Sequence, residues 1–406
     1  MADVTNYIDR LVAELCPDGV EYRPLGSLGK RNKGTAITAS KMRSLEPGNK
    51  DLRIFAAGST FVDTDSSNIP AKDILHGPAI IVKSRGYIGF EYYEKSFTHK
   101  NEMWSYTLDN SIVDQKFIYY YLLTQAYYLQ ELARSKSVKL PQLSVKDTDS
   151  LEVPVPPLEI QEAIVEILDK FTNLEAELEA ELEAELEART LQYEYYRDSL
   201  FEALDCPRVP LGSFARLVRG SGMPKTDFSE SGVGAIHYGQ IYTKFGTATA
   251  EVIAHVPEDK AKKLAVVNPG DVIVANTSEN LEDVCKAVAW VGESDIVTGG
   301  HATVIKAPEQ NAKFISYYMA TGQFNKDKRR HAFGTKVIDV APKNLAKIEF
   351  PVPSLEEQQR IVDILDRFDA LTSSLSEGLP AELAARRSQY EYYRDQLLSF
   401  PRKGGN

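Results

Sequence analysis

The chain repeats a long stretch of its own sequence at a constant spacing of 197 residues. Pro154-Val155-Pro156 returns as Pro351-Val352-Pro353, and the heptapeptide QYEYYRD at 192–198 returns at 389–395. Between these blocks leucine occupies every fourth position in both copies, namely Leu174, Leu178, Leu182 and Leu186 in the first and Leu371, Leu375, Leu379 and Leu383 in the second. Such regular self-similarity predicts a duplicated structural unit.

A second match has a different spacing and divides each repeat into parts. Pro24-Leu25-Gly26-Ser27 returns 186 residues later as Pro210-Leu211-Gly212-Ser213. Each repeat is therefore expected to contain a leader, a globular part of variable length and a long helix. The predicted boundaries are 1–156 for a leader helix and the first globular domain, 157–205 for a central long helix, 206–353 for the second globular domain, 354–400 for a C-terminal long helix and 401–406 for a flexible tail.

The repeated stretch has the composition of a long helix. It starts after Pro156-Pro157 and can continue for about 43 residues, roughly 65 Å at the rise of an α-helix, and Leu, Glu and Ala dominate its middle. Leucines spaced by four residues drift around a helix, which suits ridge-into-groove packing better than a strict heptad seam. Gly378 and Pro380 are expected to kink or interrupt the second copy. Two related helices after two related domains predict a pseudo-two-fold antiparallel pair.

Both globular parts contain short β-type runs separated by glycines. The runs are 52–55, 79–82, 87–90 and 103–106 in the first part, and 235–238, 271–274 and 302–305 in the second. A helix is predicted from Phe117 to Leu132, apolar on most of its surface and therefore buried, and its start recurs at Phe314. The expected fold class is α+β, with two globular domains of mixed α/β structure separated by a pair of long antiparallel helices in a pseudo-two-fold internal repeat.

The formal net charge of −11 is concentrated in the first long helix. Residues 157–201 contain 13 acidic and 3 basic residues, whereas 1–150 contain 18 acidic and 19 basic, and 202–353 contain 17 acidic and 18 basic. The globular parts are therefore nearly neutral and can carry local basic patches. No run of 18 apolar residues occurs, and Asp3 and Asp9 lie where a secretory signal would be basic or apolar. We expect a cytoplasmic protein without membrane association and with three reduced cysteines.

Sequence patterns for catalysis are missing. Neither a G-x-G-x-x-G turn after a predicted strand nor a Walker lysine motif occurs, and the six histidines lack H-x-x-x-H and H-E-x-x-H spacings. Asn276-Thr277-Ser278-Glu279 resembles a methyltransferase motif only superficially, and a polar turn is the favoured interpretation. We expect a non-catalytic chain with no metal site and no bound cofactor.

Cations on glycine-containing turns, among them the basic run Lys328-Arg329-Arg330, favour nucleic-acid binding, because backbone and side chain can both approach phosphate there. Short polar side chains near Gly239 and Gly300 could read base edges. Each patch alone is more often a solvated loop, but patches in both domains favour DNA. The predicted DNA contacts are Lys33, Thr35, Ser84, Arg85, Tyr87, Lys136 and Lys139 in the first domain, and Ser221, Lys225, Tyr238, Gln240, Asn276, Thr277, Ser278, His301, Arg329, Arg330 and Lys336 in the second.

The repeated block also resembles a known family. The pattern P-V-P-x-L-E-x-Q-x-x-I-V-x-I-L-D-[K/R]-F occurs twice, and Y-E-Y-Y-R-D closes each long helix. This resembles the constant regions of type I restriction-modification specificity subunits, and the resemblance covers the whole chain. It implies a DNA-reading subunit without catalytic residues, in which each of two target-recognition domains reads one half of an asymmetric bipartite site and the helices set the unread gap.

The resemblance implies partners as well. They would be double-stranded DNA, two modification subunits that methylate adenine, and two restriction subunits held through them. S-adenosylmethionine, ATP and Mg would be bound by those partners. Candidate docking contacts on the long helices are Phe171, Tyr193, Tyr196, Phe368, Tyr390 and Tyr393, and the seam between the two helices is an equally weighted alternative for these aromatic side chains.

Two other functions stay open on the sequence alone. The helix pair could belong to a DNA-independent, two-headed scaffold that holds two small domains for protein partners. A self-sufficient DNA methyltransferase is disfavoured by the missing cofactor motifs. Direct DNA binding separates the scaffold from the DNA reader, and methyl transfer by the purified chain would support the methyltransferase.

Overall fold

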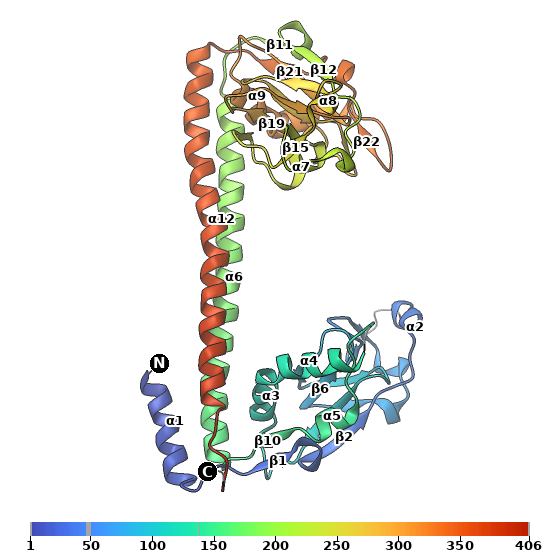
Figure 1. The fold of residues 1–406 in the computed structure, drawn as a ribbon, viewed down its shortest axis with the longest axis vertical. Helices are drawn as coiled ribbons and strands as arrows, with labels where there is room; N and C mark the ends of the chain where they lie inside the picture. The colour runs from blue at the N-terminus through green and yellow to red at the C-terminus, as the bar shows by residue number, and fades with distance from the viewer. Residues whose placement is uncertain (1, 46–49, 138, 405–406) are drawn as a thin grey trace. The chain divides into compact units, whose positions relative to one another are not determined.

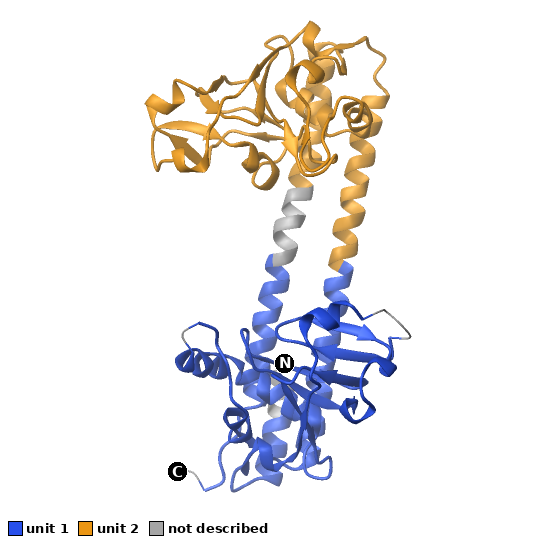
Figure 2. Ribbon diagram, turned by 90° about the vertical axis from the view of Figure 1, so that its right-hand side faces the viewer, with its two compact units in different colours: residues 1–181, 381–406 blue, residues 182–380 orange. Residues whose placement is uncertain are grey.

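The computed structural model describes residues 2–45, 50–137 and 139–404, without the side chains of 2–6 and 372–380. The chain forms two compact units, unit 1 (Met1–Glu181 with Ala381–Asn406) and unit 2 (Leu182–Pro380), which are coloured separately in Figure 2. The division falls within the two longest helices, α6 (Leu158–Glu202) and α12 (Leu355–Leu397). Each unit therefore contains a globular part, the start of one long helix and the end of the other.

Unit 1 has two four-stranded sheets (Figure 1). The antiparallel sheet has the order β2 (Gly29–Lys33), β9 (Trp104–Leu108), β6 (Ala79–Lys83) and β7 (Gly89–Tyr93). The mixed sheet has the order β4 (Phe61–Thr64), β3 (Leu52–Phe55), β8 (Ser96–His99) and β5 (Leu75–His76), with β3 parallel to β8. β1 (Tyr22–Pro24) pairs with β10 (Glu152–Pro154) directly before α6. The shorter helices are α1 (Ala2–Leu15), α2 (Ala39–Arg43), α3 (Gln115–Thr124), α4 (Ala126–Lys136) and α5 (Val145–Asp149).

Unit 2 repeats this plan with one more strand in its larger sheet and one additional two-stranded ribbon. Its larger sheet has the order β12 (Arg216–Arg219), β21 (Ala302–Lys306), β17 (Val272–Ala275), β19 (Ala287–Trp290) and β14 (Ala248–Thr249). Its mixed sheet has the order β15 (Ala254–Val256), β13 (Val233–Ile236), β20 (Ile296–Thr298) and β16 (Ala265–Val267), with β13 parallel to β20. Two ribbons pair β11 (Arg208–Pro210) with β23 (Glu349–Pro351), and β18 (Thr277–Ser278) with β22 (Ile338–Asp339). The shorter helices are α7 (Tyr238–Thr243), α8 (Glu258–Ala261), α9 (Ala312–Met319), α10 (Gly322–Arg329) and α11 (Pro342–Leu345).

The strand orders confirm the predicted fold class and its internal repeat. The parallel pair β3–β8 of unit 1 corresponds to β13–β20 of unit 2, and the ribbon before α6 corresponds to the ribbon before α12. Because strand pairing is matched across both sheets, the repeat extends through the globular parts, where the sequence similarity is weak.

Two local predictions are wrong. The single helix expected over 117–132 is two helices, since Gln125 ends α3 and begins α4. The second half is buried on one face only, because Leu129 is buried whereas Tyr127 and Tyr128 are exposed. The strand expected to reach Tyr238 ends at Ile236, because His237 Nδ1 accepts a hydrogen bond from Gly239 N–H and caps α7. The expected kink at Gly378 and Pro380 lies in 372–380, outside the residues whose side chains are described.

The repeated glutamine and aspartate of the long helices hold the globular part in each unit. In unit 1, Gln161 Oε1 accepts from the N–H of Asp114, which caps α3 (2.7 Å). Asp169 forms an ion pair with Lys116 (2.7 Å) and accepts a hydrogen bond from the Tyr120 hydroxyl (2.6 Å). The same contacts recur in unit 2 among Asn311, Lys313, Tyr317, Gln358 and Asp366. These positions of the repeated motif therefore have a structural role within each unit.

The end of the other long helix closes the core of each unit. In unit 2, Phe201 of α6 is buried, and its ring packs at 5.0 Å from Phe314 and 5.5 Å from Tyr318. In unit 1, Leu398 is buried just after α12, and Phe400 packs its ring 6.1 Å from Phe117. The two ends therefore fill equivalent places with different side chains.

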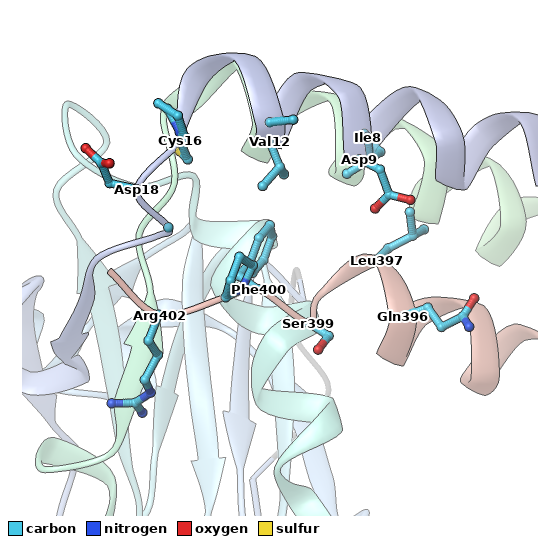
Figure 3. Close-up of a pocket in the computed structure, with 14 residues that line it drawn as sticks. Ile8, Asp9, Val12, Cys16, Asp18, Gln396, Leu397, Ser399, Phe400 and Arg402 are labelled. Atoms are coloured by element: carbon cyan, nitrogen blue, oxygen red, sulfur yellow. The ribbon is translucent and has the colours of Figure 1, made fainter. Parts of the chain in front are cut away.

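A cavity of about 600 Å³ lies in unit 1 between α1 and the segment that follows α12 (Figure 3). Ile8 and Val12 face it from α1, and Leu397 and Phe400 face it from the other side. Cys16 lies at its edge and is a free cysteine. Over the described part of the chain, no helix combines the length and apolar composition that crossing a membrane requires.

Candidate nucleic-acid interface

The loops that follow two equivalent strands occupy equivalent places in the two units. Residue 84 follows β6, and residue 276 follows β17. The Ser84 carbonyl accepts a hydrogen bond from Leu143 N–H, and the Asn276 carbonyl accepts one from Val340 N–H, both at 2.9 Å. The next residues also pair antiparallel, Arg85 with Gln142 and Thr277 with Asp339. The structure therefore brings the strand-end loop together with the segment that follows the second short helix, α4 or α10, in each unit.

Three of the predicted DNA contacts are buried and use their side-chain donors inside the protein. Thr35 is buried and donates its hydroxyl hydrogen bond to Asp73 (2.9 Å), and Ser84 is buried and donates to the Glu102 carbonyl (2.6 Å). Asn276 is fully buried, and its Nδ2 donates to the Val340 carbonyl (3.1 Å). Because these donors are used inside the protein, we correct the prediction. We assign Ser84 and Asn276 to positioning of the strand-end loops, and Thr35 to its internal contact with Asp73.

Polar side chains gather around the strand-end loop of unit 2, where His301 is exposed and Tyr238, Gln240, Thr277 and Ser278 are half-buried. His301 Nδ1 lies 3.1 Å from the Thr277 hydroxyl, and the His301 ring packs 5.0 Å from the Tyr238 ring. His301 has a positive φ of 66°, which a non-glycine residue rarely adopts. Ser278 is half-buried in the same loop, and Gln240 Oε1 accepts from His237 N–H in the α7 cap. Burial, the nearby Lys225 and His301 together lower the pKa of His237, which favours a neutral imidazole.

Exposed cations lie beside these loops in both units. In unit 1, Lys33, Arg85 and Lys139 are exposed, and Lys136 is exposed and ion-paired with Asp147. Tyr87, with 77% of its surface exposed, follows Gly86 in the Arg85 loop. In unit 2 the exposed cations are Lys225, Arg329, Arg330 and Lys336. Ser221 is exposed as well, and its hydroxyl donates a hydrogen bond to the Lys263 carbonyl.

Lys328, the first residue of the basic run 328–330, does not belong to this surface. It is buried, and its Nζ donates to the carbonyl oxygens of Glu282 (2.7 Å) and Val284 (2.8 Å). Burial lowers its pKa. The expectation that Lys328 is available to phosphate is therefore wrong, because its ammonium group holds the 282–284 loop.

Most of the candidate docking aromatics on the long helices contact one another within a unit. Phe171 and Tyr390 have ring centroids 6.5 Å apart in unit 1, and Tyr196 stacks on Phe368 at 5.4 Å in unit 2. Tyr193 is half-buried beside Arg197, and Tyr393 packs against Tyr392. These contacts favour the helix seam for Phe171, Tyr196, Phe368 and Tyr390. The outward aromatics that the sequence prediction omitted are Tyr195 and Tyr392, 69% and 59% exposed.

Three exposed apolar residues beside the candidate interface were also missed. Val337 and Leu140 are exposed, and each follows an exposed lysine, Lys336 or Lys139. The two lysine–apolar pairs are 197 residues apart, so the constant spacing could have identified them. Phe333 is exposed in unit 2 only, and its position in the sequence carries no such signal.

The geometry offers binding chemistry in both units. Among the side chains described, no cluster of three or more His, Cys, Asp or Glu residues could hold a metal ion. Cations, amide and hydroxyl groups and exposed rings on firmly held loops can contact phosphates, base edges and base faces.

Comparison with known proteins relates both repeats to one family. The model of a family described as type I restriction modification DNA specificity domain matches residues 17–188 and 209–385. The type I restriction enzyme EcoR124I/EcoR124II specificity subunit of Escherichia coli is 31% identical over 428 residues, covering 98% of each chain.

Two solved structures have a similar fold. A chain from a structural study of complex assembly and conformational transition in a type I R-M system aligns with a TM-score of 0.64 at 14% identity, over 93% of this chain and 94% of that one. The HsdS subunit from Thermoanaerobacter tengcongensis aligns with a TM-score of 0.51 at 14% identity, over 95% of this chain and 97% of that one.

Proposed function

This chain belongs to the type I restriction-modification DNA specificity family, and we propose that each of its units reads one half of a bipartite DNA site through its strand-end loop. In unit 1 the proposed contacts are Lys33, Arg85, Tyr87, Lys136 and Lys139. In unit 2 they are Ser221, Lys225, Tyr238, Gln240, Thr277, Ser278, His301, Arg329, Arg330 and Lys336. The chain itself has no catalytic role in this proposal.

The pairing of equivalent loops carries this proposal. The Ser84–Leu143 and Asn276–Val340 hydrogen bonds fix the same two segments in both units, while the exposed residues on those segments differ apart from the equivalent Lys139 and Lys336. A shared scaffold with different exposed side chains is suited to reading two different half-sites, because phosphate contacts position a domain and base contacts specify sequence.

Sequencing of methylated DNA from cells that express this chain with its modification subunit tests the proposal. We expect a bipartite motif that disappears when the chain is deleted. Thr277→Ala with His301→Ala should relax one half of the motif, and Arg85→Ala with Tyr87→Ala should relax the other. A motif that persists without the chain, or one whose two halves change together in both variants, would contradict the assignment of one half-site to each unit.

We also assign partner docking and spacing to the long helices. Tyr195 and Tyr392 are the exposed aromatics at equivalent positions, and they would contact modification subunits, which bind S-adenosylmethionine; restriction subunits, with ATP and Mg, would join through those subunits. Inserting one LEAE unit lengthens a helix by about 6 Å and turns it by about 40°, against 3.4 Å per base pair and about 34° to 36° of twist. The methylated motif should then gain one or two base pairs in its gap, and an unchanged gap would contradict the spacing role.

A further inference from the structure

The turn after α10 presents two apolar side chains to solvent. Phe333 is 66% exposed and Val337 is 58% exposed. The Phe333 N–H donates to the Asp339 carbonyl (3.0 Å), and the Asp339 N–H donates to the Phe333 carbonyl (2.8 Å). Between them, Gly334 has a φ of 118°, and a Cβ atom there would clash with the Val337 carbonyl oxygen. The turn is therefore closed by hydrogen bonds, with the ring of Phe333 outside the core.

The charges around this turn favour an anionic partner. Arg329 and Arg330 precede it, and Lys336 lies within it; all three are exposed. Two of them form ion pairs: Arg329 Nη2 lies 3.6 Å from Glu282 Oε1, and Arg330 Nη1 lies 3.3 Å from Asp327 Oδ1. Lys336 has no ion pair within the described ranges. Exposed ion pairs of this kind are weak and exchange readily for phosphate.

The turn also lies beside the side chains proposed to read bases. Its far strand, β22, pairs with β18, so Ile338 is opposite Ser278 and Asp339 is opposite Thr277. Thr277 in turn contacts His301. A single exposed phenylalanine is common on protein surfaces. Here, however, the ring and the cations lie on a segment that pairs with the loop of Thr277 and Ser278, the side chains proposed to read bases. Phenylalanine is among the side chains that proteins insert between base steps of a duplex.

We propose that Phe333, supported by Val337, is an apolar wedge that inserts at a base step of the half-site read by unit 2. The proposal rests on the proposed function, because it requires unit 2 to lie against DNA. Inserting the ring would remove it from water and replace base stacking that the kinked step loses, and the neighbouring cations would hold the adjacent phosphates. The sequence of the corresponding segment of unit 1, residues 136–142, contains no aromatic residue, and its Gln142 pairs with Arg85.

The test uses the chain assembled with its modification subunit and a duplex that contains the methylated motif mapped in cells. 2-Aminopurine placed at successive steps of the unit 2 half-site reports local unstacking through its fluorescence. We expect one step to brighten on binding, and Phe333→Ala to abolish that signal and weaken binding about tenfold, in line with alanine substitutions at stacked rings. Phe333→Trp should restore both. Ile253→Ala, which removes another exposed apolar side chain of unit 2, should change neither.

The outcomes separate this proposal from the proposed function. If the wild-type complex binds and methylates the motif but Phe333→Ala leaves affinity and fluorescence unchanged, the wedge is excluded and DNA reading stands. If Phe333→Ala instead prevents assembly with the modification subunit, the ring belongs to a protein interface and the wedge is excluded as well. If the wild-type complex binds no DNA, both proposals fail.

Discussion

Units 1 and 2 share the same frame of strands and internal contacts, and they differ in the loop side chains that this frame exposes. The frame includes the strand order, the Gln161 and Gln358 contacts, and the Asp169 and Asp366 contacts. On the strand-end loops, unit 1 presents Arg85 and Tyr87, whereas unit 2 presents Thr277 beside His301. Under the proposed function, a few loop residues would read the two half-sites differently, because the hydrogen bonds that position the loops are made by buried groups and backbone.

The largest expected effect comes from the different core closures of the two units. Phe201→Ala should destabilise unit 2 by about 3–5 kcal/mol, since a large buried ring leaves a cavity. Leu398→Ala, its match at the 197-residue spacing, should cost less in unit 1, because Phe400 supplies the ring that packs on Phe117. Hydrogen exchange of α9 and α3 amides reports the two units separately. Equal losses in both units would break the comparison.

A buried histidine should make unit 1 the more acid-sensitive unit. Burial lowers the pKa of His99 from 6.5 to about 4, while the Lys100 carbonyl opposes the shift. Because the folded pKa of His99 lies below its unfolded pKa, protonation favours the unfolded state. The free energy of unfolding is therefore highest above about pH 6.5 and falls by about 3 kcal/mol in total as the pH drops toward about 4. Exchange in β8 measured between pH 7 and 4 should show this loss. His99→Gln should flatten the profile, and a slope that survives the substitution would assign it to another group.

Lys328 and Arg329 are adjacent cations of unit 2, and we expect only Lys328 to contribute to the stability of the fold. Lys328→Gln should cost about 2 kcal/mol, because it leaves the carbonyl groups of Glu282 and of the buried Val284 without their donor. Arg329→Gln should stay within about 0.5 kcal/mol of wild type, since its side chain is exposed. Denaturant unfolding of both variants measures the difference. If Arg329→Gln destabilised as much as Lys328→Gln, the division between scaffold and surface would be wrong.

The smallest expected effect concerns Lys139 and Lys336, the lysines at equivalent positions of the two units, and asks whether both contact phosphate. Lys139→Gln and Lys336→Gln should each reduce the slope of log affinity against log salt by about 1, as expected for one phosphate contact. Lys347→Gln, an exposed lysine of unit 2 outside the candidate interface, should leave the slope unchanged. Titrations at several salt concentrations give the slopes. A change confined to one unit would show that the two loops approach DNA differently.

The sequence by itself determined the repeat, the fold class and the family. Constant spacings are a global property, so they identified the duplicated unit and both long helices without any packing information. The prediction failed where local pattern competes with tertiary contacts. The 117–132 run is apolar enough for one buried helix. In the structure, however, α3 ends at Gln125, and the helix that follows exposes Tyr127 and Tyr128.

Only the tertiary structure decided which residues of each loop face outward. Ser84 and Arg85 are adjacent in sequence, as are Asn276 and Thr277, yet in each pair the first is buried and bonded to the scaffold. The reason is that the partner segment at Leu143 or Val340 joins from about 60 residues away, as the Asn276–Val340 bond shows with its separation of 64. Lys328 was misassigned and Phe333 was missed for the same reason, since burial depends on distant chain that a local pattern does not contain.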